Sequence, residues 1–261
     1  MTTNQNTIFL RNDDVRQELD PELITLTEMC IDLSIPLTHA VEPANVSNRV
    51  VEWLLNMKSK NPNLIEIIQH GYDHNLSKLH QKMEFGGTRN YEDQYNAIIK
   101  GKKMMNSYFG EAWSPVFTFP YGTYNFETLS AVNDAGYKVI SSKVNFSFKN
   151  RFKNRMGRLF GTDFILDKKI SYHTTKRPHF DFHEISVSAN VIRKYTGNRT
   201  AIHYSKSEVL QQIATAQKFT NQIGLLFHHR FHTKEFPVFA NLLKDLKQMG
   251  YHFSTIIDLI R

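Results

Sequence analysis

Short apolar runs alternate with longer amphipathic segments along the 261 residues of the chain. The short runs have the length of β-strands, and the longer segments carry apolar residues at helical spacing. About seven or eight repeats of strand and helix predict a parallel sheet, either open or closed into a barrel. The expected strands are Thr7–Leu10, Pro36–Ala40, Leu64–Gln69, Val116–Phe119, Tyr137–Ser141, Glu184–Ser188, Ile223–Phe227 and Tyr251–Ser254.

The segments between these strands predict helices with recognisable ends. Ser205, with Glu208 three residues later, predicts a capping box, and Gly136 and Gly250 are suited to follow helix C-termini. Asp20 precedes a proline and predicts an N-cap. The expected helices are Pro21–Leu33, Val46–Lys60, Tyr91–Phe109, Asn125–Ala135, Ser205–Thr220 and Glu235–Met249.

The composition excludes several classes of protein. Hydrophobic residues make up 41% of the chain, which is too many for a disordered protein. Cys30 is the only cysteine, so an internal disulfide and a Cys-x-x-Cys motif are both excluded. No apolar run reaches membrane-spanning length, and the N-terminus lacks the pattern of a signal peptide. We expect residues 1–261 to form a single domain of a cytoplasmic protein.

The positive charge of the chain is local. The formal net charge is +7, but residues 138–177 alone contain eleven Lys and Arg against two Asp. Weak periodicity marks an excursion from the repeating pattern at about residues 142–178. A rim that attracts a phosphate-bearing substrate would explain this charge, and a nucleic-acid surface, a membrane surface and a plainly solvated face are the alternatives. Because no nucleic-acid-binding motif accompanies the segment, we expect no nucleic-acid partner.

Chemically capable side chains follow the first and third expected strands. In parallel α/β folds, working groups gather at the carboxyl ends of the strands. Asp13 and Asp14 follow the first strand, and adjacent carboxylates there point in different directions, so one can bind a metal while the other serves as a base. His70 and His74 follow the third strand at a spacing that brings two imidazoles together. Each pair alone is a weak signal, because acidic turns and spaced histidines are common.

Two further motifs follow later strands. Pro120, Tyr121 and Gly122 form a Pro-x-Gly turn, which can aim backbone N–H groups into a cleft as oxyanion donors, although ordinary turns share this pattern. Leu226 and His228 are two residues apart, so they share one face of their strand. His228 is suited to act as a general acid beside an apolar wall, or it belongs to a surface histidine cluster.

In order, spacing and strand placement, these motifs resemble those of the polysaccharide deacetylases, carbohydrate esterase family four, which contain the nodulation-type deacetylase domain. The matching segments read RNDDV, HGYDH, FTFPYGTY and LLFHH. The resemblance covers roughly residues 7–254. It implies an irregular (β/α)7 barrel of the TIM-like type.

The resemblance also implies one divalent metal ion, held by Asp14, His70 and His74. Two neutral imidazoles, one carboxylate and open positions describe a catalytic site rather than a closed structural one. Zinc is the first expectation, and cobalt, nickel and iron also suit this ligand set.

The other motif residues have implied roles in catalysis and in substrate binding. Asp13 would be the general base, and His228 would protonate the departing amine. The backbone N–H of Tyr121, in its Pro120–Gly122 turn, would stabilise the tetrahedral oxyanion. The side chain of Leu226 would contact the acetyl methyl group. Contacts with the sugar ring are expected from the aromatic neighbours of the motifs, Tyr72 and Tyr124.

The chain departs from the family pattern at four points. In the first motif, Asn12 and Val15 stand where the family usually has Phe and Gly. Gly71 replaces a Ser or Thr, and Thr118 replaces the Arg that orients the base. Arg11 is a candidate substitute partner for Asp13. The Asp-Trp motif, whose Asp tunes the catalytic His, has no clear counterpart, and the candidates to replace it are Asp163, Asp167 and Asp181.

The sequence therefore predicts a metal-dependent hydrolase that removes an acetyl group, most simply an N-acetyl group, from a sugar. Glycan, lipopolysaccharide or envelope precursor synthesis would be its setting, and the basic segment would suit a phosphate-bearing substrate. The alternative is a catalytically silent barrel that binds a glycan or a nucleotide-sugar, which the missing Arg and Asp-Trp motifs would explain.

Overall fold

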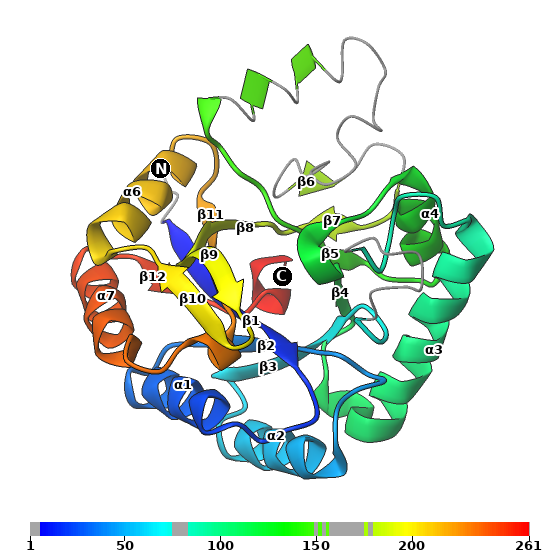
Figure 1. The fold of residues 1–261 in the computed structure, drawn as a ribbon, viewed down its shortest axis with the longest axis horizontal. Coiled ribbons are helices and arrows are strands. Elements are labelled where there is room, and N and C mark those ends of the chain that lie inside the picture. Colours follow the sequence, from blue (N-terminus) through cyan, green and yellow to red (C-terminus); the bar gives the residue numbers. More distant parts are fainter. Residues whose placement is uncertain are drawn as a thin grey trace.

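A sheet of parallel strands curls round the centre of the molecule and is surrounded by helices (Figure 1). The structure is a computed structural model and describes residues 6–74, 83–148, 151–152, 155–156, 175–176 and 180–260. Neighbouring strands in the sheet are β5 (Val139–Ser141), β4 (Val116–Thr118), β3 (Ile65–His70), β2 (Leu37–Val41), β1 (Thr7–Val15) and β11 (Gln222–Phe227).

One segment connects the two edges of this sheet. Its first part, β7 (His183–Glu184), pairs with β5, and its second part, β8 (Val187–Asn190), pairs with β11. An isolated bridge between Lys143 and Val187 adds a contact between the two edges. All of these pairings are parallel, so the sheet forms a distorted barrel. This confirms the fold class that the alternating pattern and the family resemblance predict.

Two short strands lie outside this ring of parallel strands. β6 (Thr175–Lys176) pairs antiparallel with β7, and β12 (His252–Phe253) pairs in parallel with β1.

The helices lie where the periodicity predicts them, to within a few residues. Ser205 and Glu208 form the expected capping box, and Gly136 and Gly250 adopt positive φ beyond their helices. Asp20 is the N-cap of the first helix, but its side chain makes no capping hydrogen bond. The helices are α1 (Pro21–Asp32), α2 (Asn48–Lys60), α3 (Tyr91–Phe109), α4 (Phe126–Asp134), α6 (Lys206–Ala216) and α7 (Phe236–Gln248), with short 3-10 turns η1 (Gly110–Ala112), η2 (Pro120–Gly122), η4 (His229–Phe231) and η5 (Ile257–Ile260).

Among the helices that the structure describes, none has both the length and the apolar character needed to span a lipid bilayer.

Two elements differ from the sequence prediction. β1 continues past Leu10 to Val15 and includes the acidic pair, because a register shift against β2 lets the strand accommodate it. An antiparallel hairpin, β9 (Ile192–Gly197) and β10 (Thr200–His203), was not expected. Five of the six residues of β9 are exposed, so the hairpin lacks the apolar alternation that marks a half-buried strand.

Packed side chains close the barrel at the amino ends of its strands. A Cβ atom on Gly224 would lie 2.3 Å from Phe9 Cζ and 2.5 Å from Val187 Cα, so only glycine fits there. η5 lies within the ring of strands in Figure 1, and the buried Glu66 accepts hydrogen bonds from the backbone N–H groups at the start of this turn. The opposite, carboxyl ends of the strands are therefore the place for a substrate cavity.

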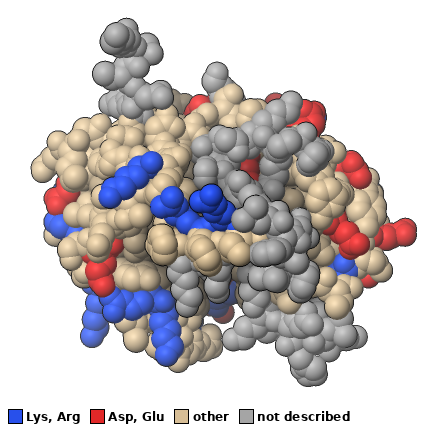
Figure 2. Space-filling model, turned by 90° about the horizontal axis from the view of Figure 1, so that it is seen from above, with Lys and Arg blue, Asp and Glu red and all other residues tan. Residues whose placement is uncertain are grey.

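The predicted basic excursion at 142–178 lies largely outside the described residues, so its proposed role as a rim stays a prediction. Figure 2 views the molecule from the top of Figure 1. Described Lys and Arg side chains form one group left of the middle of this face and another at its lower left edge, whereas Asp and Glu side chains lie mainly towards the left and right edges.

Candidate active site

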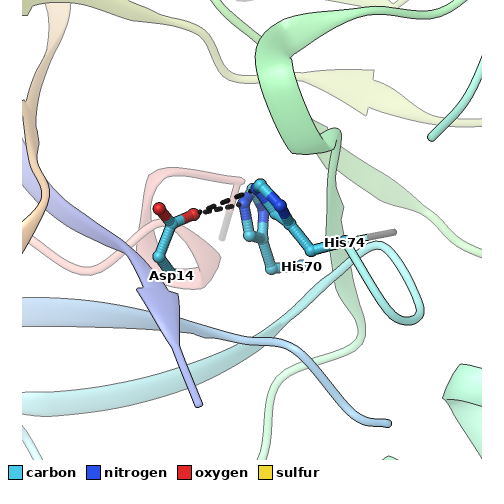
Figure 3. Close-up of side chains that lie close together, drawn as sticks. All are labelled: Asp14, His70 and His74. Carbon is cyan, nitrogen blue, oxygen red and sulfur yellow. Dashed lines mark ion pairs between the residues drawn. The ribbon is translucent and has the colours of Figure 1, made fainter. Parts of the chain in front are cut away.

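Asp14, His70 and His74 point towards one another at the carboxyl ends of β1 and β3 (Figure 3). Asp14 Oδ1 lies 3.3 Å from His70 Nε2 and 3.2 Å from His74 Nε2. The possible ligand atoms of the three side chains all lie within 4.8 Å of one another. Within the described part of the chain, this is the one group of three or more His, Cys, Asp and Glu side chains so arranged. The structure thus brings the three predicted ligands together.

These three side chains fit a divalent cation. Asp14 Oδ1 is buried and has no hydrogen-bond partner, although two imidazole nitrogens face it. Burial opposes ionisation of Asp14, but His70 and His74 hold its pKa well below the usual range. Burial also opposes charge on His74, but Asp14 raises the His74 pKa to about 9. A cation would satisfy the unpaired oxygen, and one carboxylate with two imidazoles is a common catalytic ligand set.

Local backbone geometry presents these ligands. Asp14 has φ +63° at the register shift in β1, and His74 has φ +51° at the end of the loop after β3. The loop needs a glycine as well, because Gly71 has φ +57° and a Cβ atom there would lie 2.4 Å from Pro120 Cγ and 2.6 Å from Glu84 Oε2. This explains why glycine stands where the family has Ser or Thr.

Glu84 holds the loop that carries His74, and sequence reasoning did not find it. Its carboxylate accepts hydrogen bonds from the backbone N–H of Tyr72 at 2.6 Å and of His74 at 2.8 Å. Burial raises the pKa of Glu84 to about 8. No local motif marks this residue, since it reaches the loop from outside the His-x-x-x-His segment.

Arg11 clamps Asp13, which gives the predicted base a fixed orientation. Arg11 Nε and one terminal NH2 group donate to the two carboxylate oxygens of Asp13, at 2.8 and 2.9 Å. The other terminal nitrogen donates to the backbone and side-chain oxygens of Ser141, both at 2.8 Å. Burial opposes ionisation of Asp13, but the Arg11 charge holds its pKa below the usual value. Arg11 therefore supplies the contact that Thr118 cannot make, as the sequence suggested.

His228 faces the same cavity and contacts a tyrosine rather than a carboxylate. The hydroxyl of Tyr195, on β9, lies 3.2 Å from His228 Nδ1. Burial lowers the pKa of His228 to about 4, despite the nearby charges of Asp14 and Asp13. Among the described residues, no carboxylate lies within ion-pair distance of this imidazole.

Of the three predicted tuning carboxylates, the structure describes only Asp181, and it does not contact His228. Asp181 is exposed and pairs with Lys138, so its proposed role is wrong. Asp163 and Asp167 lie outside the described residues. Tyr195 was missed because its hairpin is not predicted and because nothing in its local sequence relates it to His228.

In the third motif, Tyr121 lies beside the site, whereas Pro120 and Tyr124 are buried. Tyr121 has φ +59°, and its ring lies 4.3 Å from the His74 ring. Pro120 is buried below the turn. Tyr124 is only 1% exposed and stacks on Phe119 at 4.3 Å, so the predicted sugar contact is wrong for Tyr124.

Tyr72 is also not part of the cavity wall. Lys100 Nζ lies 4.8 Å from the centre of its ring, and the residue is partly buried. The sugar contact predicted for Tyr72 therefore has no support from its position.

A cavity of about 930 Å³ is lined by the three predicted metal ligands. This volume lies within the range of about 300–1,000 Å³ that is typical of small-molecule sites. Several predicted residues line it: Asp13, Asp14, His70, His74, Tyr121, Gly122, Leu226 and His228. Others were not predicted as site residues: Arg16, Asn45, Asp73, Phe119, Thr123, Lys143, Tyr195 and Phe231.

Comparison with known proteins agrees with this geometry. The polysaccharide deacetylase family model matches residues 1–140. A search of curated proteins finds no match.

Solved structures share the fold at low sequence identity. A protein from Mycobacterium smegmatis assigned to the polysaccharide deacetylases has a TM-score of 0.66 and 10% identity, with 100% of this chain and 90% of the other covered. A family 4 acetyl xylan esterase from Clostridium thermocellum, in complex with a cobalt ion, has a TM-score of 0.55 and 11% identity, with 97% and 90% covered. A CE4 family pseudoenzyme from Bacillus anthracis has a TM-score of 0.55 and 13% identity, with 99% and 66% covered.

Proposed function

We propose that this chain, which belongs to the polysaccharide deacetylase family, carbohydrate esterase family four, is a metal-dependent hydrolase that removes an acetyl group from a sugar. The observation that carries the proposal is the convergence of Asp14, His70 and His74 beside a second carboxylate, Asp13, which Arg11 holds in place. One carboxylate is thus free to serve as a base, while the other belongs to the ligand group.

Each residue of the cavity would have a different role in acyl hydrolysis. A bound divalent ion would polarise the acyl carbonyl and make a water molecule more acidic. Asp13 would accept the proton of that water, since the Arg11 clamp keeps the carboxylate ionised and fixed. His228 would return a proton to the departing nitrogen or oxygen, and Leu226 would contact the acetyl methyl group. The backbone N–H of Tyr121 would stabilise the oxyanion.

The finer parts of the proposal concern the bond, the metal and the setting. We propose an N-acetyl group as the first substrate to test and zinc as the first metal, with cobalt, nickel and iron as alternatives. Synthesis of a glycan, a lipopolysaccharide or another envelope precursor in the cytoplasm is the proposed setting.

A catalytically silent barrel that binds a glycan or a nucleotide-sugar is the second candidate. The observation in its favour is that a pseudoenzyme of the same family shares the fold. The Arg11–Asp13 pair argues against a catalytically silent barrel. This candidate was motivated by the missing family Arg that orients the base, and Arg11 makes that contact with Asp13 instead. Release of acetate separates the two.

The test is acetate release from a panel of N- and O-acetylated sugars by protein loaded with each metal, together with metal content by mass spectrometry. We expect Asp14→Ala and His74→Ala to lose both the metal and the activity. Asp13→Asn should keep the metal but lose activity by about a hundredfold or more, because the general base is removed. Asp32→Asn, an exposed change at the end of α1, is the matched control. Unchanged acetate release by Asp13→Asn would overturn the proposal.

A further inference from the structure

Arg16 is a cavity cation with unused hydrogen-bonding capacity. It follows directly after β1, lines the cavity, and leaves 27% of its side chain exposed. Its nearest carboxylate oxygens are Asp14 Oδ2 at 3.7 Å and Glu42 Oε1 at 3.5 Å, both too far for a hydrogen bond. Arg16 Nε is buried and has no hydrogen-bond partner in the described structure. A guanidinium in this state has donors to offer a ligand.

Neither acid near Arg16 forms a hydrogen bond with it. Asp14 belongs to the group of predicted metal ligands, and a bound cation would take up its charge. Glu42 is fully buried, and its Oε2 accepts a hydrogen bond at 2.7 Å from Asn45 Nδ2. Glu42 Oε1, which faces Arg16 at 3.5 Å, has no hydrogen-bond partner among the described residues. Glu42 therefore offers Arg16 a charge contact but leaves its N–H donors available.

A second guanidinium adds positive charge beside the first. Arg230, in η4, also has a buried Nε without a hydrogen-bond partner, and its nearest carboxylate oxygen is Asp20 Oδ2 at 3.6 Å. Asp20 is already bound by Arg199 and faces His229 Nε2 at 3.4 Å. Burial and the charge of Arg16 lower the pKa of Arg230, so the two cations lie within electrostatic reach of each other.

We propose that Arg16, supported by the charge of Arg230, binds an acidic group on the substrate, either a carboxylate or a phosphate. The planar fork of a guanidinium matches the paired oxygens of both groups, and the partial burial of the Arg16 side chain strengthens the contact. The acetylated sugar that enters the cavity, or the unit joined to it, thus carries a negative charge. This inference rests on the proposed deacetylase function, and it uses none of the residues of the basic excursion.

The first test compares one sugar with and without its acid. N-acetylglucosamine is the neutral substrate, and its 6-phosphate and its 6-carboxylate (the uronic acid) are the charged ones. We expect the unchanged protein to prefer a charged sugar, and the better of the two identifies the acid. Arg16→Gln should raise KM for that sugar by about ten- to a hundredfold and leave KM for the neutral sugar within about twofold, because a charged hydrogen bond is lost.

Two further variants separate recognition from structure. Arg16→Lys keeps the charge but loses the fork, so we expect an intermediate rise in KM for the charged sugar. Arg49→Gln removes an exposed arginine on α2 and is expected to change nothing. Metal content is measured on every variant. A loss of metal from Arg16→Gln, or an equal loss of activity towards both kinds of sugar, would assign Arg16 to the ligand group and overturn the proposal.

A binding measurement keeps this proposal apart from the proposed function. Calorimetry follows glucuronate, glucose 6-phosphate and neutral glucose as they bind to the metal-loaded protein and to Arg16→Gln. Binding of one acidic sugar that is weakened at least tenfold in Arg16→Gln supports the anion site, even where no acetate is released from any substrate. Equal binding of the acidic and neutral sugars contradicts it, even where acetate release confirms the enzyme.

Discussion

At the scale of single residues, Arg11 and Asp13 show how one departure from a family pattern offsets another. The family Arg is replaced by Thr118, yet the guanidinium of Arg11, two positions earlier on the same strand, donates to both carboxylate oxygens of Asp13, the proposed base. Both side chains are almost fully buried, so the pair is strongly coupled. Removal of one partner from such a pair leaves an uncompensated charge and costs about 3–5 kcal/mol.

We therefore predict that Arg11→Gln lowers kcat by at least about tenfold and lowers the free energy of unfolding by about 3–5 kcal/mol. Arg11→Lys keeps the charge and should recover part of both losses. The double variant Arg11→Gln with Asp13→Asn removes both charges, so it should be more stable than Arg11→Gln alone. Denaturant unfolding and acetate release measure these effects. A kcat that stays unchanged in Arg11→Gln would remove Arg11 from its positioning role.

At the scale of elements, the β9–β10 hairpin delivers a residue to the site from outside the barrel. Arg199, between the two strands, forms an ion pair with Asp20, and His203 Nε2 lies 2.9 Å from His232 Nδ1. The hairpin is thus fixed to the N-terminus of α1 and to the turn after His228. These contacts place the Tyr195 hydroxyl against the His228 imidazole.

Tyr195→Phe removes only this hydroxyl, so we predict a loss of about three- to tenfold in kcat with little change in KM, since one neutral hydrogen bond contributes about 0.5–1.5 kcal/mol. The alkaline limb of the pH–rate profile, which reports the general acid, should move as well, because His228 loses its partner. Tyr91→Phe removes a surface hydroxyl on α3 that bonds to Asp134, and it is the control. An unchanged rate and profile in Tyr195→Phe would mean that the hydroxyl contributes only packing.

The same elements show what the sequence could and could not predict. The predicted metal ligands lie at the carboxyl ends of apolar strands that converge, so the local pattern brings Asp14 and His70 together correctly. Tyr124 was misplaced because proximity in sequence to the third motif says nothing about direction, and its ring turns inward onto Phe119. Tyr195 reaches His228 through a contact between elements far apart in the chain, which no local spacing encodes.

At the scale of the whole molecule, buried neutral histidines near the site make the free energy of unfolding depend on pH. Burial lowers the pKa of His39 to about 3, and it lowers the pKa values of His229 and His232 as well. His39 Nδ1 lies 3.3 Å from Asn12 Nδ2, and Asn12 Oδ1 accepts a hydrogen bond from the backbone N–H of His229 at 2.9 Å. The imidazoles of His39 and His229 lie within a polar network between β1, β2 and η4, where a charge would be poorly solvated.

The stability of the protein should therefore fall as the pH falls below about 6.5, the ordinary pKa of histidine. Below that pH the histidines of the unfolded chain bind protons, whereas His39 in the folded chain stays unprotonated because its pKa is about 3. Each such histidine contributes a slope of about 1.4 kcal/mol per pH unit between pH 6.5 and 5. Glu84 contributes a slope of opposite sign, because burial raises its pKa in the folded state to about 8, so the contribution of His39 is measured as the difference between variants. Denaturant unfolding of His39→Gln should show a shallower slope in this range, whereas His252→Gln, an exposed change in β12, should keep the slope of the unchanged protein. An equal slope in His39→Gln and in the unchanged protein would show that the His39 imidazole accepts a proton within the fold.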